Sequence, residues 1–488
     1  MEILKRNRYW IAMVVLILPA LLRGVWFYHG LPSHSKVEQP DYAANVLPQP
    51  PVSTPAPENV TLTSGKVVVL DDNHSNQFVP SEVENFISEL TKRGARVEVD
   101  TGDPSLFTRL RYASAYLIFS PSTYFSAEEV NQLKAFVSQG GRLIVFADPT
   151  RGLTSIDYST GSTYSKPDVD YLNPVLAPYG VAVNKDYLYN LDKHEGNFRN
   201  IFFTQFGRHA LTDGLSQVVF YGAHSMQTEG GTPLILGDAK TLSSNTDAGG
   251  GLVAAALSGN GNVLVFGDFS FLVPPYNTVA DNNLLIGRIA DFALSGSHTH
   301  VIADFPYVFD RTVSVVPTGK LQLGTDILGS LASLQKAIEE TDIKLEFNPK
   351  PDSSTDRLVL GIISPGEDLA PYLEPFDLGM DDPQSITLPD FGTINRAGIG
   401  LLLYQHTATR NTLVLLTDSE SDLPSLVSSL AAGDLTSCVV HEDVGACAVG
   451  SGGGSYSGSS SFMNFPSLEI PSYTPEFTPS ISTPTPLP

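Results

Sequence analysis

The chain has 488 residues, with 29 lysines and arginines against 52 aspartates and glutamates, which gives a formal net charge of −23. A chain of this length can form roughly two or three domains, and a surface this acidic repels phosphate backbones, which argues against nucleic acid as a partner. Hydrophobic residues at 42% and aromatic residues at 9% exclude a wholly disordered chain. Two cysteines are too few for a disulfide-dense scaffold or a four-thiolate zinc site.

Residues 1–30 predict a basic flank followed by a membrane anchor. The uncharged run 9–22 is short for a span, but it continues to Tyr28 if the charged end of Arg23 reaches the membrane surface, and about 20 residues are enough to cross. The basic residues before this run predict a single-pass anchor in the cell membrane with a cytoplasmic N-terminus. A cleaved signal peptide is the alternative, and the poor match to a small-residue cleavage site favours the anchor. Both alternatives place residues 31–488 outside the cytoplasm.

Two segments have the composition of unfolded chain. Residues 31–64 are rich in proline and poor in apolar residues, which predicts an extended linker between the membrane and a folded body. Residues 451–488 are rich in glycine and serine and then in proline and threonine, and they contain no lysine or arginine. This composition predicts a flexible, disordered tail.

Residues 65–300 predict an α/β domain. Short apolar strands alternate with amphipathic helices, and this alternation is typical of a parallel, doubly wound sheet. Residues 151–250 interrupt the pattern with many tyrosines, glycines and asparagines, and they predict an inserted region of hairpins and loops. The expected strands are 67–70, 97–99, 116–119, 143–146 and 263–266, and the expected helices begin at Pro80, Ser105, Ser126 and Leu284.

Residues 304–450 predict a second, smaller α+β domain. Its apolar runs and amphipathic segments favour helices packed on a small, mainly antiparallel sheet. The expected helices are 326–341 and 421–431, and the expected strands are 358–363, 398–404 and 412–416, followed by a closing hairpin of 437–440 and 447–449.

Several segments of the first domain together resemble a known family. They are the strand–helix–strand segment 116–146, the segments 172–180 and 209–214, and the glycine-rich stretch 259–282. Taken in this order, they make the chain resemble a prokaryotic, membrane-anchored domain family of unknown function. That family has a fold like that of the class I glutamine amidotransferases, and it is related to auxiliary subunits of gliding-motility-type ABC export systems.

This resemblance implies a fold rather than a reaction. An amidotransferase needs a cysteine nucleophile on the turn after a core strand, activated by a histidine. Here that turn carries Ser120-Pro121-Ser122, and both cysteines lie outside the domain. The chain is therefore not expected to be a glutamine amidotransferase, and the sequence assigns no catalytic residue.

Polar side chains gather at the predicted strand ends. Ligands of open α/β sheets bind beyond the carboxyl ends of the strands. These side chains could therefore bind a polar ligand or a divalent cation, and a divalent cation is the only cofactor that the sequence suggests. The alternative, which the sequence favours, is that each aspartate caps the loop or helix after its strand. The candidate ligand-binding residues are Asp71, Asp72, His74, Ser120, Ser122, Asp148 and Asp268.

A serine nucleophile at Ser120 or Ser122 is a weaker hypothesis. The sequence has no Gly-x-Ser-x-Gly elbow, and Pro121 is an awkward neighbour for a nucleophile. Three histidines could serve as the base: His74, His209 and His224.

Cys438 and Cys447 are expected to form a disulfide, because an exported body lies in an oxidising compartment and two cysteines make one pair. They flank a polar tip in the predicted hairpin. Directly opposed cysteines would leave Glu442-Asp443 as a two-residue turn, which is unfavourable for the positive φ that such turns need. A bulge at Gly445 would shift the register instead, and two buried free thiols are the remaining alternative.

These observations favour a non-catalytic, membrane-anchored, extracytoplasmic protein. Its amidotransferase-like domain would bind a ligand or a protein, with an envelope protein or the subunits of an ABC-type exporter as partners. The alternatives are an extracytoplasmic hydrolase that uses the strand-end carboxylates and a glycan-binding surface protein.

Overall fold

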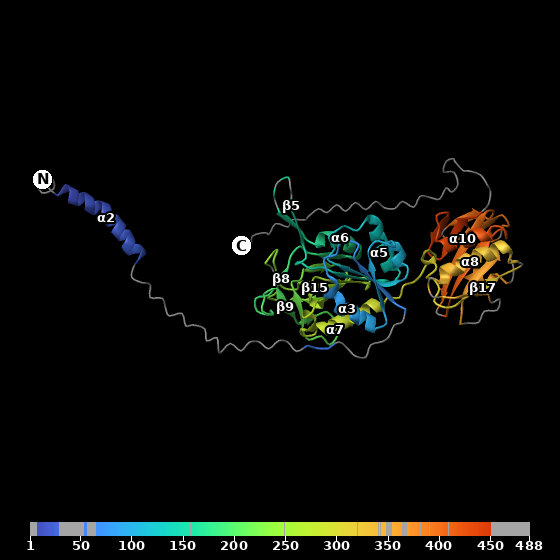
Figure 1. Ribbon diagram of the computed structural model, residues 1–488, viewed down its shortest axis with the longest axis horizontal. Coiled ribbons are helices and arrows are strands. Elements are labelled where there is room, and N and C mark those ends of the chain that lie inside the picture. The colour runs from blue at the N-terminus through green and yellow to red at the C-terminus, as the bar shows by residue number, and fades with distance from the viewer. Residues whose placement is uncertain are drawn as a thin grey trace, which may run out of the picture.

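The protein contains an N-terminal helix and two folded domains (Figure 1). Most of the predicted linker 31–64 and all of the predicted tail 451–488 lie outside the described residues. The computed structural model describes residues 7–28, 53–55, 65–156, 159, 161, 163–247, 249–319, 321–339, 341, 343–347, 354–363, 368–380, 382–389, 391–407 and 409–449.

The N-terminal helix α2 spans Arg8–Phe27 and stands apart from both domains (Figure 1). An 18-residue stretch of this 20-residue helix has a mean hydropathy of 2.0, and none of its residues is buried in the protein. At 1.5 Å per residue the helix is about 30 Å long, which matches the hydrocarbon thickness of a bilayer. By length and composition, α2 can therefore cross a membrane.

The first domain is built on a ten-stranded sheet, flanked by short two-stranded pairs. Five neighbouring strands, in the order β2-β1-β3-β4-β16, run parallel, as the sequence predicts. The strands are β1 (Val67–Asp71), β2 (Arg96–Asp100), β3 (Ala113–Phe119), β4 (Arg142–Phe146), β5 (Leu153–Ile156), β6 (Thr163–Lys166), β7 (Val181–Val183), β8 (Leu188–Tyr189), β9 (Asn200–Phe203), β10 (Gln205–Phe206), β11 (Val218–Tyr221), β12 (Met226–Thr228), β13 (Thr232–Leu236), β14 (Leu242–Ser243), β15 (Val253–Leu257) and β16 (Val263–Phe266).

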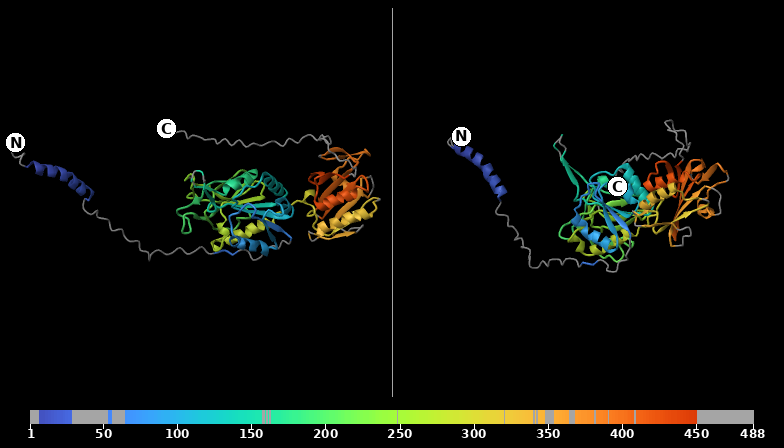
Figure 2. Two further views of the ribbon diagram at one scale, coloured as in Figure 1. Left: turned by 45° about the horizontal axis from the view of Figure 1, so that its top comes forward. Right: turned by 45° about the vertical axis from the view of Figure 1, so that its right-hand side comes forward.

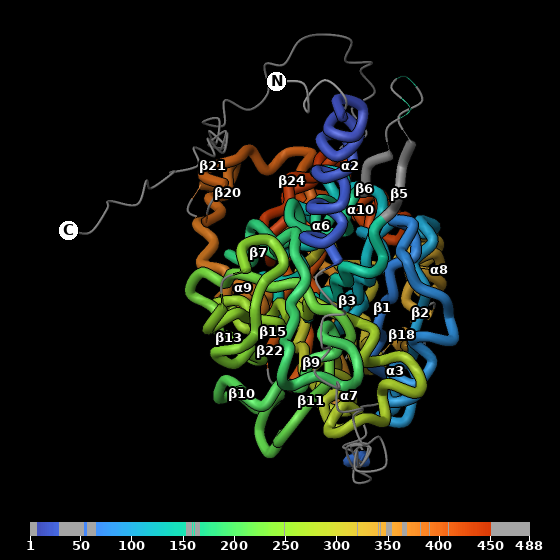
Figure 3. The backbone as a smooth tube through the Cα atoms, turned by 90° about the vertical axis from the view of Figure 1, so that its left-hand side faces the viewer, coloured from blue at the N-terminus to red at the C-terminus, as the bar shows by residue number. Residues whose placement is uncertain are grey.

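Helices cover both faces of this sheet (Figure 3). Alternate residues of β1 point to opposite faces: Val68 packs in the core with α3 and α7, whereas Val69 packs in the core with α4, α5 and α6. The two cores make the doubly wound, three-layered arrangement expected for an α/β domain. The helices are α3 (Pro80–Lys92), α4 (Leu106–Leu110), α5 (Ala127–Ser138), α6 (Val169–Leu176) and α7 (Asn282–Leu294).

Local sequence signals explain where these helices begin. Ser126 Oγ accepts a 3.2 Å hydrogen bond from the N–H of Glu129, and the Glu129 carboxylate accepts a 2.7 Å bond from the N–H of Ser126. This is the capping box that the spacing of the two residues indicates. Pro80 occupies the first turn of α3, where a missing N–H costs nothing.

Residues 151–250 contain the hairpin β5–β6 and other short antiparallel pairs, as the sequence predicts, but they also extend the main sheet. The short strands β7, β10, β12 and β13 join the main sheet beyond β16, connected through antiparallel pairing to β15. The helix α6 also lies in this region and packs on the same face as α5. Strands of two to five residues give too short a periodic pattern to be recognised locally, and they become strands because the edge of the sheet offers them partners.

The second domain lies beyond the first (Figure 2) and contains a seven-stranded sheet in the order β18-β17-β19-β23-β22-β25-β24. Helices α8 and α10 cover one face, and α9 with the hairpin β20–β21 covers the other. Its elements are β17 (Val313–Pro317), α8 (Thr325–Glu339), β18 (Leu345–Phe347), β19 (Asp356–Ile362), α9 (Ala370–Leu373), β20 (Ser385–Leu388), β21 (Gly392–Asn395), β22 (Ile399–Thr407), β23 (Arg410–Thr417), α10 (Leu423–Ala432), β24 (Cys438–His441) and β25 (Val444–Ala448).

This second sheet is mixed rather than mainly antiparallel. β18, β17, β19 and β23 pair in parallel, whereas β22, β25 and β24 pair antiparallel. The sequence pattern does not predict β17 and β18, and these two strands supply two of the three parallel pairings.

The closing hairpin joins the two cysteines. Cys438 on β24 lies directly opposite Cys447 on β25, and the two form a disulfide. Glu442-Asp443 is the turn, and Glu442 adopts the positive φ of 47° that such a turn requires. The register without a bulge is therefore the one that the structure adopts.

Candidate functional site

The carboxyl ends of the five parallel strands bring most of the candidate residues to one edge of the first sheet. The structure divides these residues between two clusters. One surrounds Asp71 at the end of β1, and the other surrounds Asp148 and Asp268, beyond the ends of β4 and β16. Asp72 is exposed and belongs to neither cluster.

Asp71 is fully buried, and its carboxylate accepts several hydrogen bonds. The donors are His74 Nδ1 at 2.9 Å, Asn76 Nδ2 at 3.1 Å and the Tyr116 hydroxyl at 3.0 Å. The Tyr116 oxygen also lies 3.0 Å from Asp100 Oδ2, so one hydroxyl bridges the carboxylates that end β1 and β2. Burial and the two neighbouring carboxylates raise the pKa of Tyr116 well above its ordinary value, so this hydroxyl remains a donor.

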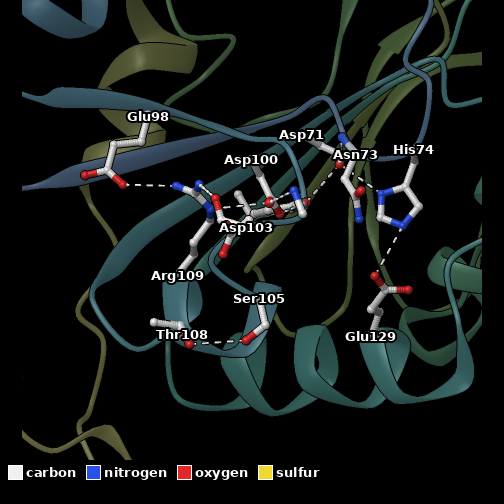
Figure 4. A network of polar contacts seen from close by, with 12 residues as sticks. Asp71, Asn73, His74, Glu98, Asp100, Asp103, Ser105, Thr108, Arg109 and Glu129 are labelled. Atoms are coloured by element: carbon white, nitrogen blue, oxygen red, sulfur yellow. Dashed lines mark hydrogen bonds and ion pairs between the residues drawn. The ribbon is translucent and has the colours of Figure 1, made fainter.

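His74 connects this cluster to the start of α5 (Figure 4). Its Nδ1 faces Asp71, its Nε2 lies 3.6 Å from Glu129 Oε1, and its ring stacks on Phe125 with the centroids 3.5 Å apart. Burial alone would lower the pKa of His74, but the two carboxylates outweigh burial and raise it. These contacts hold the capped end of α5 against the end of β1.

Arg109 on α4 contacts the acidic residues of β2 in the same cluster (Figure 4). Its guanidinium lies 3.3 Å from both Glu98 and Asp100, and Asp100 also accepts a 2.9 Å hydrogen bond from the N–H of Gly102. The carboxylate of Asp100 is therefore occupied by side chains and by the loop that follows its strand.

Asp168 connects Ser120, which follows β3, with Asp148, which follows β4. Ser120 is fully buried, has a positive φ of 35°, and donates a 2.7 Å hydrogen bond to Asp168 Oδ2. The same oxygen accepts the N–H of Asp148 at 2.8 Å, and Asp168 Oδ1 lies 3.3 Å from His224 Nε2. The polar partner of the Ser120 hydroxyl is thus a carboxylate rather than a histidine, which does not fit a serine nucleophile.

Asp148 and Asp268 form a buried pair, and both side chains are fully enclosed. Burial raises the pKa of Asp148, and burial followed by the charge of Asp148 raises the pKa of Asp268 well above its ordinary value. The hydroxyl of Ser270 donates to Asp148 at 2.8 Å, while the N–H of Ser270 donates to Asp268 at 2.8 Å. Two adjacent carboxyl groups in this setting share a proton rather than ionise together.

The remaining bonds of these residues go to the loops that follow the strands. Asp148 Oδ1 accepts both the N–H and the hydroxyl of Thr150, at 2.8 and 2.6 Å. The Ser122 hydroxyl donates to the carbonyl of Ser75 at 2.7 Å. Bonds of this kind are the loop-capping contacts that aspartate and serine make after a strand.

The sequence does not predict two members of the hydrogen-bond network at the strand ends, Asp168 and His224, or a separate group of side chains outside that network. No local pattern indicates Asp168, and the sequence indicates His224 only as a base for a serine nucleophile. The outside group is His298, His300 and Asp304, in the segment that joins the two domains. The sequence signal for this group is a His-x-His pattern followed by an aspartate four residues after the second histidine. The sequence does not reveal where this segment lies in the fold, so the pattern by itself does not indicate a site.

A cavity of about 860 Å³ lies beside this joining segment. Helices α4 and α5 supply one wall, with Phe107 and Phe136, and the joining segment supplies the other, with His298 and Asp304. Burial alone would raise the pKa of Asp304, but its contacts with His298, His300 and the N–H of Val301 lower it to about 2. This carboxylate is therefore ionised at neutral pH.

Comparisons with known proteins relate the first domain to a transport system. Residues 64–248 match the model of a family described as "ABC-type uncharacterized transport system". The match covers less than half of the chain and begins at the first strand of the α/β domain. It supports a relation to the auxiliary components of ABC-type systems, which the sequence resemblance implies. A comparison with the curated proteins found no match.

A comparison with solved structures found matches of low overall similarity. The mmIFT52 N-terminal domain is 13% identical over 47% of this chain and 98% of its own length, with a TM-score of 0.37. A ThuA-like protein from Bacteroides uniformis is 11% identical over 51% of this chain and 98% of its own, with a TM-score of 0.27. A β-galactosidase from Halorubrum lacusprofundi is 14% identical over 49% of this chain and 31% of its own, with a TM-score of 0.27. Likeness at this level says nothing about the function of this chain.

Proposed function

We propose that this chain is a non-catalytic accessory of an ABC-type transport system, anchored in the cell membrane by α2. Its amidotransferase-like domain and its second domain would be presented outside the cytoplasm to subunits of the transporter or to another envelope protein. The observation that carries this proposal is the family match over 64–248, which falls in the domain that follows the apolar helix Arg8–Phe27.

The chemistry of the strand ends supports a non-catalytic role. Asp71, Asp148, Asp268 and Ser120 are all fully buried, and their polar atoms make hydrogen bonds within the protein. A general acid, base or nucleophile must reach its substrate, so a hydrolase that uses these carboxylates would first have to open the loops that cover them. Neither cysteine lies in the first domain, so the thiol of a glutamine amidotransferase is missing there.

Two further features support an extracytoplasmic body. The basic residues precede the apolar helix, as they do in anchors with a cytoplasmic N-terminus. The disulfide between Cys438 and Cys447 is the kind of bond that persists in an oxidising compartment.

Crosslinking in native membranes tests the proposal. An affinity-tagged full-length chain, crosslinked in cells and purified in mild detergent, should enrich an ABC permease or ATPase over an unrelated single-pass membrane protein with the same tag. A variant lacking residues 8–27 should lose this enrichment, because its body is no longer held at the membrane. Equal recovery with the unrelated protein would rule out the transporter association.

Orientation and catalysis need separate measurements. Protease added to intact cells should degrade the two domains, and their protection would overturn the extracytoplasmic placement. Purified protein should release no ammonia from glutamine. Release that is abolished by a substitution in the first domain, such as Ser120→Ala, would overturn the non-catalytic assignment.

A further inference from the structure

The segment between α7 and the second domain carries three side chains that converge. His298, His300 and Asp304 each offer one metal-ligating atom, and these atoms lie within 4.8 Å of one another. Among the residues that the structure describes, no other set of three or more histidine, cysteine, aspartate or glutamate side chains has this spacing. The group lies outside the strand-end network and belongs to no site that the proposed function uses.

Two of the three ligating atoms are buried and make no hydrogen bond, although each lies near the Asp304 carboxylate. His298 Nε2 and His300 Nδ1 are inaccessible to solvent and form no hydrogen bond of acceptable geometry, although both face Asp304. The side chain of His298 is only 6% exposed. Because a buried polar atom without a partner is destabilising, an occupant that bonds to both imidazole lone pairs would remove that cost.

Two of the three distances between the ligating atoms are close to the edge length of a tetrahedral coordination sphere. Zinc bonds to imidazole nitrogen and carboxylate oxygen at about 2.0–2.1 Å, which places neighbouring tetrahedral ligands roughly 3.3–3.4 Å apart. Asp304 Oδ2 lies 3.4 Å from His298 Nε2 and 3.7 Å from His300 Nδ1. A movement of a few tenths of an ångström would complete both edges.

Surrounding contacts hold the ligands in a ligating orientation. His298 Nδ1 lies 3.5 Å from the carbonyl oxygen of Ala113, and metal-bound histidines commonly use their second nitrogen in this way. Asp304 Oδ2 accepts a 2.9 Å hydrogen bond from the N–H of Val301. The rings of His298 and His300 stack with centroids 4.6 Å apart, and Phe136 packs edge-on against His298.

We propose that His298, His300 and Asp304 bind a divalent transition-metal ion, with zinc the best fit, where the first domain joins the second. Two imidazoles and one carboxylate suit zinc better than calcium or magnesium, which prefer oxygen ligands. His298 and Asp304 line the cavity of about 860 Å³, so the fourth coordination position faces that cavity and takes water or a ligand bound there.

The ion would fix the joining segment against the first domain. Ala113, which contacts His298, is the first residue of β3, and Phe136 lies on α5. Asp304 ends a short helix, η4 (Ile302–Asp304), that precedes β17. Metal binding would therefore limit how the second domain moves relative to the first.

Zinc binding to the full-length chain in detergent tests the site directly. After the protein is stripped with a chelator, calorimetric titration with Zn²⁺ should give one equivalent per chain, and Co²⁺ should give the visible absorption of a tetrahedral site. His300→Ala is the informative variant, because its side chain is 20% exposed and its loss disturbs packing least. We expect it to weaken zinc binding roughly tenfold or more.

The matched control is His441→Ala, which removes an exposed histidine outside the group and should leave the affinity unchanged. Both variants should unfold at the parent's temperature in chelator, so that a change in binding is not a change in folding. The proposal is wrong if the parent binds no zinc, if His300→Ala binds as tightly as the parent, or if both variants weaken binding equally.

Discussion

Asp148 and Asp268 lie against each other beyond the ends of two adjacent parallel strands, and Ser270 donates one hydrogen bond to each of them. Both carboxyl groups are fully buried. The pair therefore holds a proton that the same residues lose readily in the unfolded chain, and this difference couples folding to pH.

The first prediction concerns that coupling. Well below pH 4 both residues are protonated in the folded and the unfolded chain, since the ordinary pKa of aspartate is about 3.9. As the pH rises, the unfolded chain loses its protons first, because the folded pKa of Asp268 is raised, so the free energy of unfolding falls until the pH passes the folded pKa. In Asp268→Asn this fall should be smaller. Relative to the parent, the free energy of unfolding of the variant should therefore rise by about 1 kcal/mol or more between low and neutral pH.

Urea unfolding of the first domain across this pH range checks the prediction. The exposed residue Asp213 provides the control, since Asp213→Asn should follow the parent at every pH. A parent and an Asp268→Asn variant with parallel stability curves would show that the pair does not hold its proton in the folded state.

The second prediction concerns Asp168, which receives bonds from Ser120, from the N–H of Asp148 and from His224. Asp168→Ala leaves these buried groups without their acceptor, and it should lower the free energy of unfolding by about 2–4 kcal/mol. Asp168→Asn keeps one acceptor oxygen and should cost less. Equal losses in the two variants, measured by urea unfolding, would mean that the acceptor oxygens contribute little.

The third prediction concerns the disulfide of the last hairpin. Replacing both Cys438 and Cys447 by serine should destabilise the second domain by roughly 2.5–3 kcal/mol, because the unfolded chain regains the freedom of a loop of about ten residues. Reductant should lower the stability of the parent by a similar amount and leave the serine variant unchanged. A parent that melts identically with and without reductant would contradict the prediction.

The fourth prediction concerns α2. The full-length chain should stay with membranes during an alkaline carbonate wash, whereas a chain without residues 8–27 should be recovered in the soluble fraction. The reason is the apolar surface of this helix, which Arg23 alone interrupts after Arg8 and none of which is buried by the rest of the protein. Release of the full-length chain by carbonate would show that the helix does not span the bilayer.

Local signals in the sequence were sufficient to predict the parallel strands of the first sheet and the helices between them. The run Val67–Leu70 is apolar throughout because both faces of β1 are covered, and the spacing of Ser126 and Glu129 indicates where α5 begins. Such features depend on neighbours within a few residues. The same local signals predict that Asp71, Asp148 and Asp268 lie at or just beyond strand ends, and the structure confirms these positions.

By itself, then, the sequence determined the apolar N-terminal helix, the alternation of strands and helices, and the polar residues at the strand ends, because each of these follows from short-range periodicity. Only the tertiary structure decided the partners. It brought Asp168 to Ser120 across 48 positions of the chain, and it gave the short strands of 151–250 a sheet edge on which to form. The sequence predicts the pairing of Cys438 with Cys447, but only the structure decided the register of their hairpin, in which the two lie directly opposite each other. Contacts between residues far apart in the sequence arise from the packing of whole elements, and no local pattern encodes them.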